Sequence, residues 1–190
     1  TAFADLYVGR QAIAWGSART VNPTDILAPY EYNELDTEDR RGVDAVRIRY
    51  PIGFMGEIDV GYAAGEDFNL ENSAAWIRAR NYYVQTDMSL LAVAFRENLL
   101  FGIDLARSLG GAGAWLELAY VRVDAFADNH ANSSGDDYLR LSCGADYSLR
   151  DGTYVFAEYH FNGAGSSKNE SYSDLQSKIA YREGAVYLLG

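Results

Sequence analysis

The sequence predicts an all-β protein whose antiparallel strands follow one another up and down, and three observations support this prediction. Apolar and polar residues alternate with a period of two on both sides of the turn at 51–56. Only 3 of the 190 residues are proline, which fits a chain whose backbone N–H groups mostly enter strand ladders. Short connections also alternate with generally longer ones along the chain, as in a meander of hairpins.

The hairpin at 43–64 shows the alternation most clearly. One face is wholly apolar, and the other carries arginines on its first strand and carboxylates on its second. The apolar face holds Val46, Ile48, Tyr50, Ile58, Val60, Tyr62 and Ala64, and the charged positions of the other face are Arg47, Arg49, Glu57 and Asp59. Charged side chains are rarely fully buried unless paired, so the charged face must meet water or form a satisfied network. The apolar face then needs a second sheet or lipid.

Composition limits the function classes. At 190 residues the chain fits one domain, 1–190, and its net charge of −11 argues against a general nucleic-acid binder. Cys143 stands alone and only His130 and His160 supply imidazole, so we expect no disulfide framework, cysteine-based metal site or cofactor. The chain contains no run of about 18 apolar residues, the length that predicts a transmembrane helix. Membrane strands need only alternating segments of about 10 residues.

The remaining elements follow from the same pattern. The first strand is predicted at 4–15, with less cleanly divided faces, and a turn or short helix is expected at Asn22-Pro23-Thr24-Asp25 inside the long connection. The segment 88–95 is apolar on both faces, and a tight turn at 96–98 follows it. Further strands are predicted at 73–81, 99–107, 115–123, 138–147, 154–162 and, at its beginning only, 185–189, with a short helix at 174–180.

The lengths of the connections predict a transmembrane β-barrel of about ten strands, since such barrels have short turns at one end and long loops at the other. Aromatic residues also gather near both ends of the apolar face, as at two membrane interfaces. The tight turn at 96–98 is the exception, a short loop at the long-loop end. The short connections are 51–56, 82–86, 108–112 and 149–152, and the long ones are 16–42, 65–72, 125–136 and 163–183.

Several short motifs carry a family resemblance. They are Gly9-Arg10-Gln11, Trp15-Gly16, Asn22-Pro23-Thr24-Asp25, RGVDAVR at 41–47 and TYVFAEYHFNGAG at 153–165. Together they resemble Gram-negative outer-membrane channels of the porin and alginate-export type. The resemblance implies a diffusion or export channel in the bacterial outer membrane, and a wider barrel of which this chain is a portion. It implies no alginate specificity, because the match is to strand architecture.

The charged residues opposite the apolar face are predicted to line a lumen. They are Arg47, Arg49, Arg78, Arg80 and Arg140 with Glu57, Asp59, Asp104, Glu117, Asp146, Glu158 and His160. Such residues set a field across a pore and bias which small polar or charged solutes pass. They also act as cross-strand pairs that hold the register of the strands, and the two roles are compatible. Outer-membrane lipid and lipopolysaccharide are the other expected partners.

Other interpretations of the sequence remain open. A soluble all-β binding protein, with a sandwich or calyx, would point its charges outward instead of inward. A hydrolase at the barrel rim is a further alternative: His160 with Glu158 and Asn162 suits acid–base chemistry, and His130 with Asp136 and Asp137 suits a loop-borne metal or protease-like site. Neither group has a nucleophile at a recognisable spacing. The acidic loop residues Glu34, Asp36, Glu38 and Asp39 suit either Ca²⁺ or plain solvation.

Overall fold

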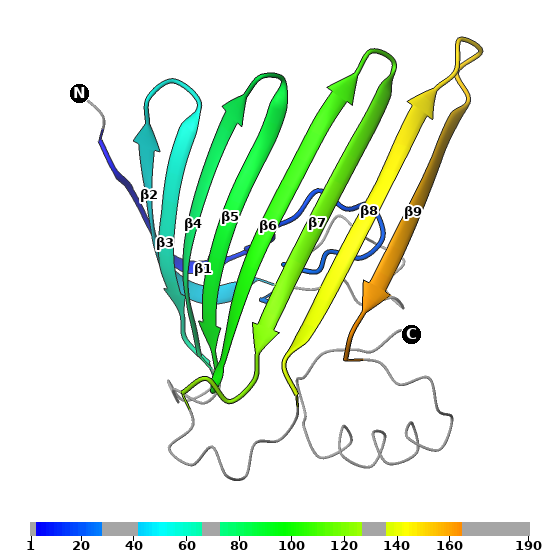
Figure 1. Ribbon diagram of the computed structural model, residues 1–190. Helices are drawn as coiled ribbons and strands as arrows, with labels where there is room; N and C mark the ends of the chain where they lie inside the picture. Colours follow the sequence, from blue (N-terminus) through cyan, green and yellow to red (C-terminus); the bar gives the residue numbers. More distant parts are fainter. Residues whose placement is uncertain (1–2, 28–41, 66–72, 127–135, 165–190) are drawn as a thin grey trace.

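The computed structural model describes residues 3–27, 42–65, 73–126 and 136–164, and nine antiparallel strands make up one sheet in these ranges. Each strand pairs with the next in the sequence, so the sheet order is the chain order (Figure 1). The strands are β1 (Asp5–Gln11), β2 (Val43–Ile52), β3 (Gly56–Ala63), β4 (Ala74–Tyr83), β5 (Thr86–Phe95), β6 (Asn98–Leu109), β7 (Ala112–Arg122), β8 (Tyr138–Ser148) and β9 (Tyr154–Asn162). The predicted all-β, antiparallel, up-and-down architecture is confirmed.

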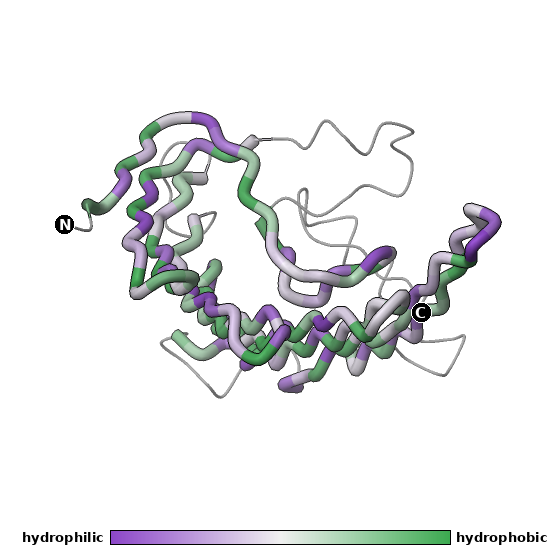
Figure 2. Tube along the Cα trace, turned by 90° about the horizontal axis from the view of Figure 1, so that it is seen from above, coloured by the Kyte–Doolittle hydropathy of each residue, from purple (hydrophilic) through white to green (hydrophobic). Residues whose placement is uncertain are grey.

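The sheet curves into a trough and does not close within the described residues. Among the nine strands of the described residues, β1 pairs only with β2, and β9 pairs only with β8. Viewed along the strands, the sheet has a concave and a convex side (Figure 2). The predicted strand at 185–189 and the predicted helix at 174–180 lie outside the described residues. Among the described residues, no helix has the length and apolar character needed to cross a membrane.

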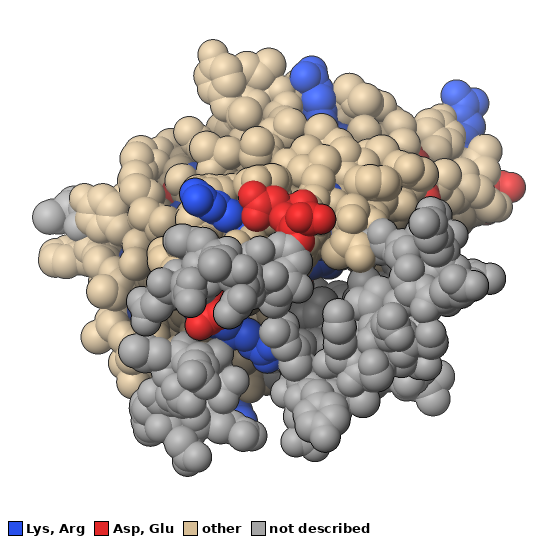
Figure 3. Space-filling view, turned by 60° about the horizontal axis from the view of Figure 1, so that its bottom comes forward, with Lys and Arg blue, Asp and Glu red and all other residues tan. Residues whose placement is uncertain are grey.

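The convex face is apolar and exposed. Ile48 lies opposite Val60 and Ile103 opposite Leu118, and these rows of aliphatic side chains point away from the trough. Ile48, Val60 and Ile77 are each exposed over roughly half of their surface, at 48%, 42% and 52%. In the space-filling view of Figure 3, charged side chains are sparse on the surface of the sheet. The register therefore places the aliphatic residues on the side that the alternation predicted.

The hydrophobic core lies on the concave side, under a segment that the sequence did not predict to fold there. After Gln11 the chain leaves the sheet, and residues 12–27, the inner segment, lie inside the curve of the trough (Figure 2). Ile13 and Trp15 pack against buried side chains of the wall, and the rings of Trp15 and Trp76 meet edge to face at 5.7 Å. The wall side chains of this core include Trp76, Leu91, Val93, Leu100, Ala119 and Val121.

This core explains why β5 is apolar on both faces. Leu91 and Val93 face inward and are buried in the core, whereas Leu90 faces outward and is 59% exposed. The predicted first strand was too long, because Ala12 to Trp15 belong to the inner segment. The predicted turn at Asn22–Asp25 is present, closed by a hydrogen bond from the Asp25 N–H to the Asn22 carbonyl.

The two ends of the sheet differ as predicted. The hairpin turns β2–β3, β4–β5, β6–β7 and β8–β9 lie at one end, at the top of Figure 1. The strand ends from which the connections β1–β2, β3–β4 and β7–β8 start lie at the other end. The tight β5–β6 turn at Arg96 and Glu97 also lies there, as the exception that the sequence predicted.

Candidate functional site

The predicted lumen residues share the concave face of the sheet. The structure divides them into two groups, one on β2–β5 and one on β6–β9. The first group contains Arg47, Arg49, Glu57, Asp59, Arg78 and Arg80, and the second contains Asp104, Glu117, Arg140, Asp146, Glu158 and His160. The inner segment contacts carboxylates of the second group, so the two halves of the concave face differ in how far their charged groups are covered by protein.

On β2 and β3 the ion pairs are diagonal. Arg47 binds Asp59 through two nitrogens, one of them Nε at 2.9 Å, although Gly61 is its partner in the register. Arg49 binds Glu57 at 2.6 Å, although Asp59 stands directly opposite. The carboxylate of Asp59 is almost fully buried and also accepts a hydrogen bond from the Trp76 indole at 3.1 Å. Arginine offers a planar fork for such two-pronged contacts.

The same diagonal offset occurs between β4 and β5. Arg78 donates from Nε to Ser89 Oγ at 2.8 Å, and Arg80 donates from Nη2 to Asp87 at 3.0 Å. Their direct partners in the register are Leu91 and Ser89. Diagonal neighbours lie within reach of long side chains. Sequence reasoning missed the polar partners on β5, Asp87 and Ser89.

Glu117 holds the inner segment at the centre of the wall. Its side chain is fully buried, and one carboxylate oxygen accepts both the N–H and the hydroxyl of Thr24, at 2.8 and 2.6 Å. The other oxygen accepts the Ala18 N–H at 3.3 Å. Asp104 stands opposite Glu117 in the register and accepts a hydrogen bond from Ser17. A buried charge needs such donors, because an unpaired one is costly.

Glu158 holds the next part of the inner segment. Its two oxygens accept the consecutive backbone N–H groups of Arg19, Thr20 and Val21 at 2.7, 3.1 and 3.2 Å. The Trp115 indole donates to the same carboxylate at 2.9 Å. Successive N–H groups that converge on one anion form a concave backbone nest. The inner segment is therefore bound to the wall mostly through its backbone.

The Arg19 side chain adds a further contact to the wall. Its guanidinium binds Asp146 at 3.1 Å and lies over the Trp115 ring, 5.4 Å from the centroid. Two glycines also let the inner segment approach closely. A side chain at Gly16, whose φ is +100°, would collide with Glu117, and a side chain at Gly102 would collide with Thr24. These contacts fix residues 16–24 against β6–β9.

His160 contacts Ser142, but the arrangement does not activate the serine. The two side chains are 2.8 Å apart at Nδ1 and Oγ, and the Ser142 hydroxyl donates its one proton to the Val21 carbonyl at 2.7 Å. Nδ1 therefore carries a proton and donates to Oγ, so it is not available as a base. Ser142 is also fully buried. His130 and the acidic residues Glu34, Asp36, Glu38 and Asp39 lie outside the described residues.

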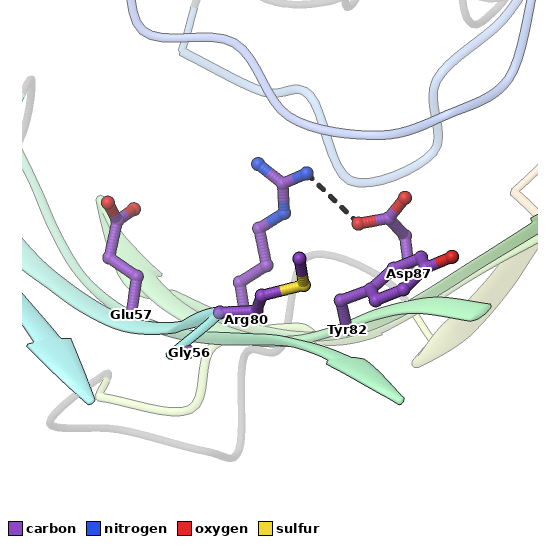
Figure 4. Close-up of a pocket in the computed structure, with 6 residues that line it drawn as sticks. Gly56, Glu57, Arg80, Tyr82 and Asp87 are labelled. Atoms are coloured by element: carbon purple, nitrogen blue, oxygen red, sulfur yellow. Dashed lines mark hydrogen bonds and ion pairs between the residues drawn. The ribbon is translucent and has the colours of Figure 1, made fainter. Parts of the chain in front are cut away.

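At the short-turn end the concave face stays open. A recess of about 400 Å³ is lined by Met55, Gly56, Glu57, Arg80, Tyr82 and Asp87. Glu57, Arg80 and Asp87 rise from the same side of the sheet, and the guanidinium stands between the two carboxylates (Figure 4). No group of three or more His, Cys, Asp or Glu side chains in residues 3–27, 42–65, 73–126 and 136–164 is placed to hold a metal ion.

Comparisons of the chain with protein-family models, with curated proteins and with solved structures found no match. The geometry of the site consists of a wall with an apolar convex face, a half-covered concave face and an open recess that carries ion pairs.

Proposed function

We propose that the nine strands form part of the wall of a β-barrel channel in the bacterial outer membrane. The channel passes small polar or charged solutes without chemistry, and the inner segment narrows it. The observation that carries the proposal is the distribution of residues over the two faces of the sheet. Aliphatic residues such as Ile77 are about half exposed on the convex side, while Asp59 and Glu117 are buried on the concave side.

Lipid suits the convex face better than water does. Each Å² of apolar surface taken out of water contributes about 25 cal/mol, and this face presents aliphatic side chains along every strand from β2 to β7. A sandwich would need a second sheet against it, but all strands of the described residues belong to one sheet. A soluble barrel or calyx would carry its charged residues on this outer side. Hydrocarbon is the environment that matches the convex face as it stands.

The proposal requires the barrel to close. Within the described residues the outer edges of β1 and β9 pair with no further strand, and each unpaired backbone group costs several kcal/mol in hydrocarbon. Barrels remove this cost by pairing every strand. Further strands must therefore complete the wall between β9 and β1, and the curvature in Figure 2 already turns the sheet in that direction.

Passage follows the half of the concave face that the inner segment leaves open. Over β6–β9 the carboxylates Glu117 and Glu158 are occupied by backbone N–H groups. Over β2–β5 the Arg80 guanidinium and the carboxylates of Glu57 and Asp87 face the open recess (Figure 4). Fixed charges beside a water-filled path set which ions enter it.

Reconstitution in a planar lipid bilayer tests the proposal. The full-length protein, extracted in detergent, is expected to produce discrete single-channel currents. A protein that purifies as a monodisperse species without detergent, and that gives no current after reconstitution, would remove the channel from consideration. The solvated recess would then belong to a soluble all-β protein.

A further inference from the structure

The four short turns at one end of the sheet carry exposed apolar side chains. Phe54 in the β2–β3 turn is 96% exposed, and Tyr83 and Val84 at the β4–β5 turn are 70% and 60% exposed. Leu109 at the β6–β7 turn and Leu149 at the β8–β9 turn are about half exposed, at 54% and 43%. Turns that project into water favour Gly, Asn, Asp and Ser instead. The end of the sheet therefore has an apolar rim, made of these five residues.

Val84 gives an independent sign that an apolar side chain is needed at the rim. Val84 and Gln85 have φ angles of 49° and 58°, the left-handed conformation of a tight hairpin turn. Asn and Gly adopt this conformation readily, whereas a β-branched residue is strained in it. The chain thus places valine where the backbone favours asparagine. Its side chain is 60% exposed, so the described residues offer little protein surface that would account for this choice.

The apolar rim continues the convex face. Tyr83 lies on the same side of β4 as Ile77, and Leu109 lies on the same side of β6 as Ile103, because even spacings along a strand share a face. Arg107 lies on this face between Ile103 and Leu109, and Arg150 stands in the β8–β9 turn. Both are exposed, and neither forms an ion pair within the described part of the chain.

We propose that the apolar rim lies in the headgroup layer of the membrane, with Arg107 and Arg150 bound to the phosphates of anionic phospholipids. This inference rests on the proposed function, since it takes the convex face to be the lipid contact. Aromatic and aliphatic side chains at this depth reach the acyl boundary, and arginines reach the phosphates. The short turns thus anchor the barrel at a fixed height instead of projecting into the aqueous phase.

Depth-dependent fluorescence quenching tests the placement. With Cys143→Ser as background, Phe54→Cys and Ile77→Cys each receive an environment-sensitive fluorophore, and the protein is inserted into vesicles with nitroxide-labelled lipids. Ile77 is the mid-strand control on the convex face. We expect quenching of position 54 mainly by nitroxides near the headgroup, and of position 77 mainly by nitroxides deep in the acyl chains.

The outcomes separate the two proposals. If position 77 is quenched by lipid while position 54 is quenched only by aqueous iodide, the rim is in water and the inference fails while the channel stands. If position 54 is shielded from both quenchers, the rim is covered by protein and the inference also fails. If neither position is quenched by lipid, the proposed membrane barrel fails, and the placement of the rim fails with it.

A matched pair of turn variants tests the role of Val84. Val84→Asn and Gln85→Asn both lower the backbone strain of the left-handed conformation, but only Val84→Asn removes an apolar side chain. In vesicles we expect Gln85→Asn to raise the urea midpoint of unfolding more than Val84→Asn does. Valine is the more strained residue, so a rim in water predicts the opposite order. An equal or larger gain for Val84→Asn would overturn the inference.

The arginines are tested with lipid composition. The wild-type protein is expected to unfold at higher urea concentration in vesicles that contain phosphatidylglycerol than in phosphatidylcholine alone. The Arg107→Gln/Arg150→Gln variant is expected to lose this difference, whereas Arg80→Gln, on the concave face, is expected to keep it. Inorganic phosphate added to phosphatidylcholine vesicles is expected to have no effect. A lipid difference that survives in the double variant would contradict the assignment.

Discussion

Thr24 and Glu117 meet at the buried centre of the concave face, where one carboxylate oxygen accepts both the N–H and the hydroxyl of the threonine. The two distances are 2.8 and 2.6 Å. This pair connects the inner segment to β7, one of the two inner strands of the β6–β9 half of the sheet. Together with the contacts that Glu158 makes to Arg19, Thr20 and Val21, it holds the inner segment against the wall.

Glu117→Gln is expected to destabilise the fold by about 1–3 kcal/mol, since the amide places donors against donors in a buried site. Thr24→Val, which removes the hydroxyl but keeps the N–H, is expected to cost about 1 kcal/mol. Urea unfolding in detergent measures both. In a double-mutant cycle the two effects are expected to be non-additive, because the side chains are in direct contact. Additive effects would mean that the pair does not hold the inner segment.

Glu158 offers a way to release the inner segment. Glu158→Ala removes the acceptor of three consecutive backbone N–H groups, from Arg19 to Val21. We expect the passage to widen and the single-channel conductance to rise. Asp151→Asn, an exposed turn substitution away from the inner segment, is the control and is expected to leave the conductance unchanged. An unchanged conductance in Glu158→Ala would show that the inner segment does not narrow the passage.

Arg80 is expected to influence which ions pass. Its guanidinium stands in the open recess between Glu57 and Asp87 (Figure 4). Arg80→Gln leaves both carboxylates without this cation, so the ratio of cation to anion permeability is expected to increase. Reversal potentials in a salt gradient measure the ratio. Arg150→Gln, at the turn end, serves as the control because it lies outside the recess, and an identical shift in both variants would argue against a role for the recess.

The junction between β7 and β8 is expected to be sensitive to acid. Asp137, just before β8, accepts hydrogen bonds from the Tyr120 hydroxyl at 2.5 Å and from the Val123 N–H at 3.0 Å. The Tyr120 hydroxyl bond, followed by the Val123 N–H, lowers the pKa of Asp137 below the ordinary 3.8. A lowered pKa means that its stabilising contribution is present above 3.8 and disappears as the pH falls through the lowered value.

Amide hydrogen exchange at Val123 measures this effect. After correction for the intrinsic pH dependence of exchange, protection of the Val123 N–H is expected to fall at pH values below 3.8. In Asp137→Asn the protection is expected to be weak at every pH. If protection of the Val123 N–H in the wild-type protein does not change as the pH falls, Asp137 does not hold the junction between β7 and β8.

The alternation of side chains predicted the wall well. Ile48 and Val60 lie opposite each other on the outer face as expected, because a shift of one residue would turn every side chain to the wrong side. The alternation did not predict the diagonal offset of the ion pairs, which depends on the twist of the strands and on side-chain reach. The direct neighbours Arg49 and Asp59 therefore bind other partners.

The inner segment was harder to predict, for a physical reason. Its contacts with Glu117 and Glu158 are made largely by backbone N–H groups, which every residue except proline carries. Only indirect signals were available in the sequence. Leu91 and Val93 made the inner face of β5 apolar, which indicated that protein rather than water covers it.

The most direct test of the proposed membrane barrel compares Ile77 and Arg78, which are adjacent on β4 and point to opposite faces. Each is replaced by cysteine in a Cys143→Ser background and labelled with the same fluorophore in lipid vesicles. A membrane barrel with this orientation predicts that position 77 is quenched by nitroxides deep in the acyl chains, and that position 78 is quenched by aqueous iodide. If position 78 is quenched by lipid and position 77 by iodide, or if lipid quenches neither, the proposed membrane barrel is contradicted.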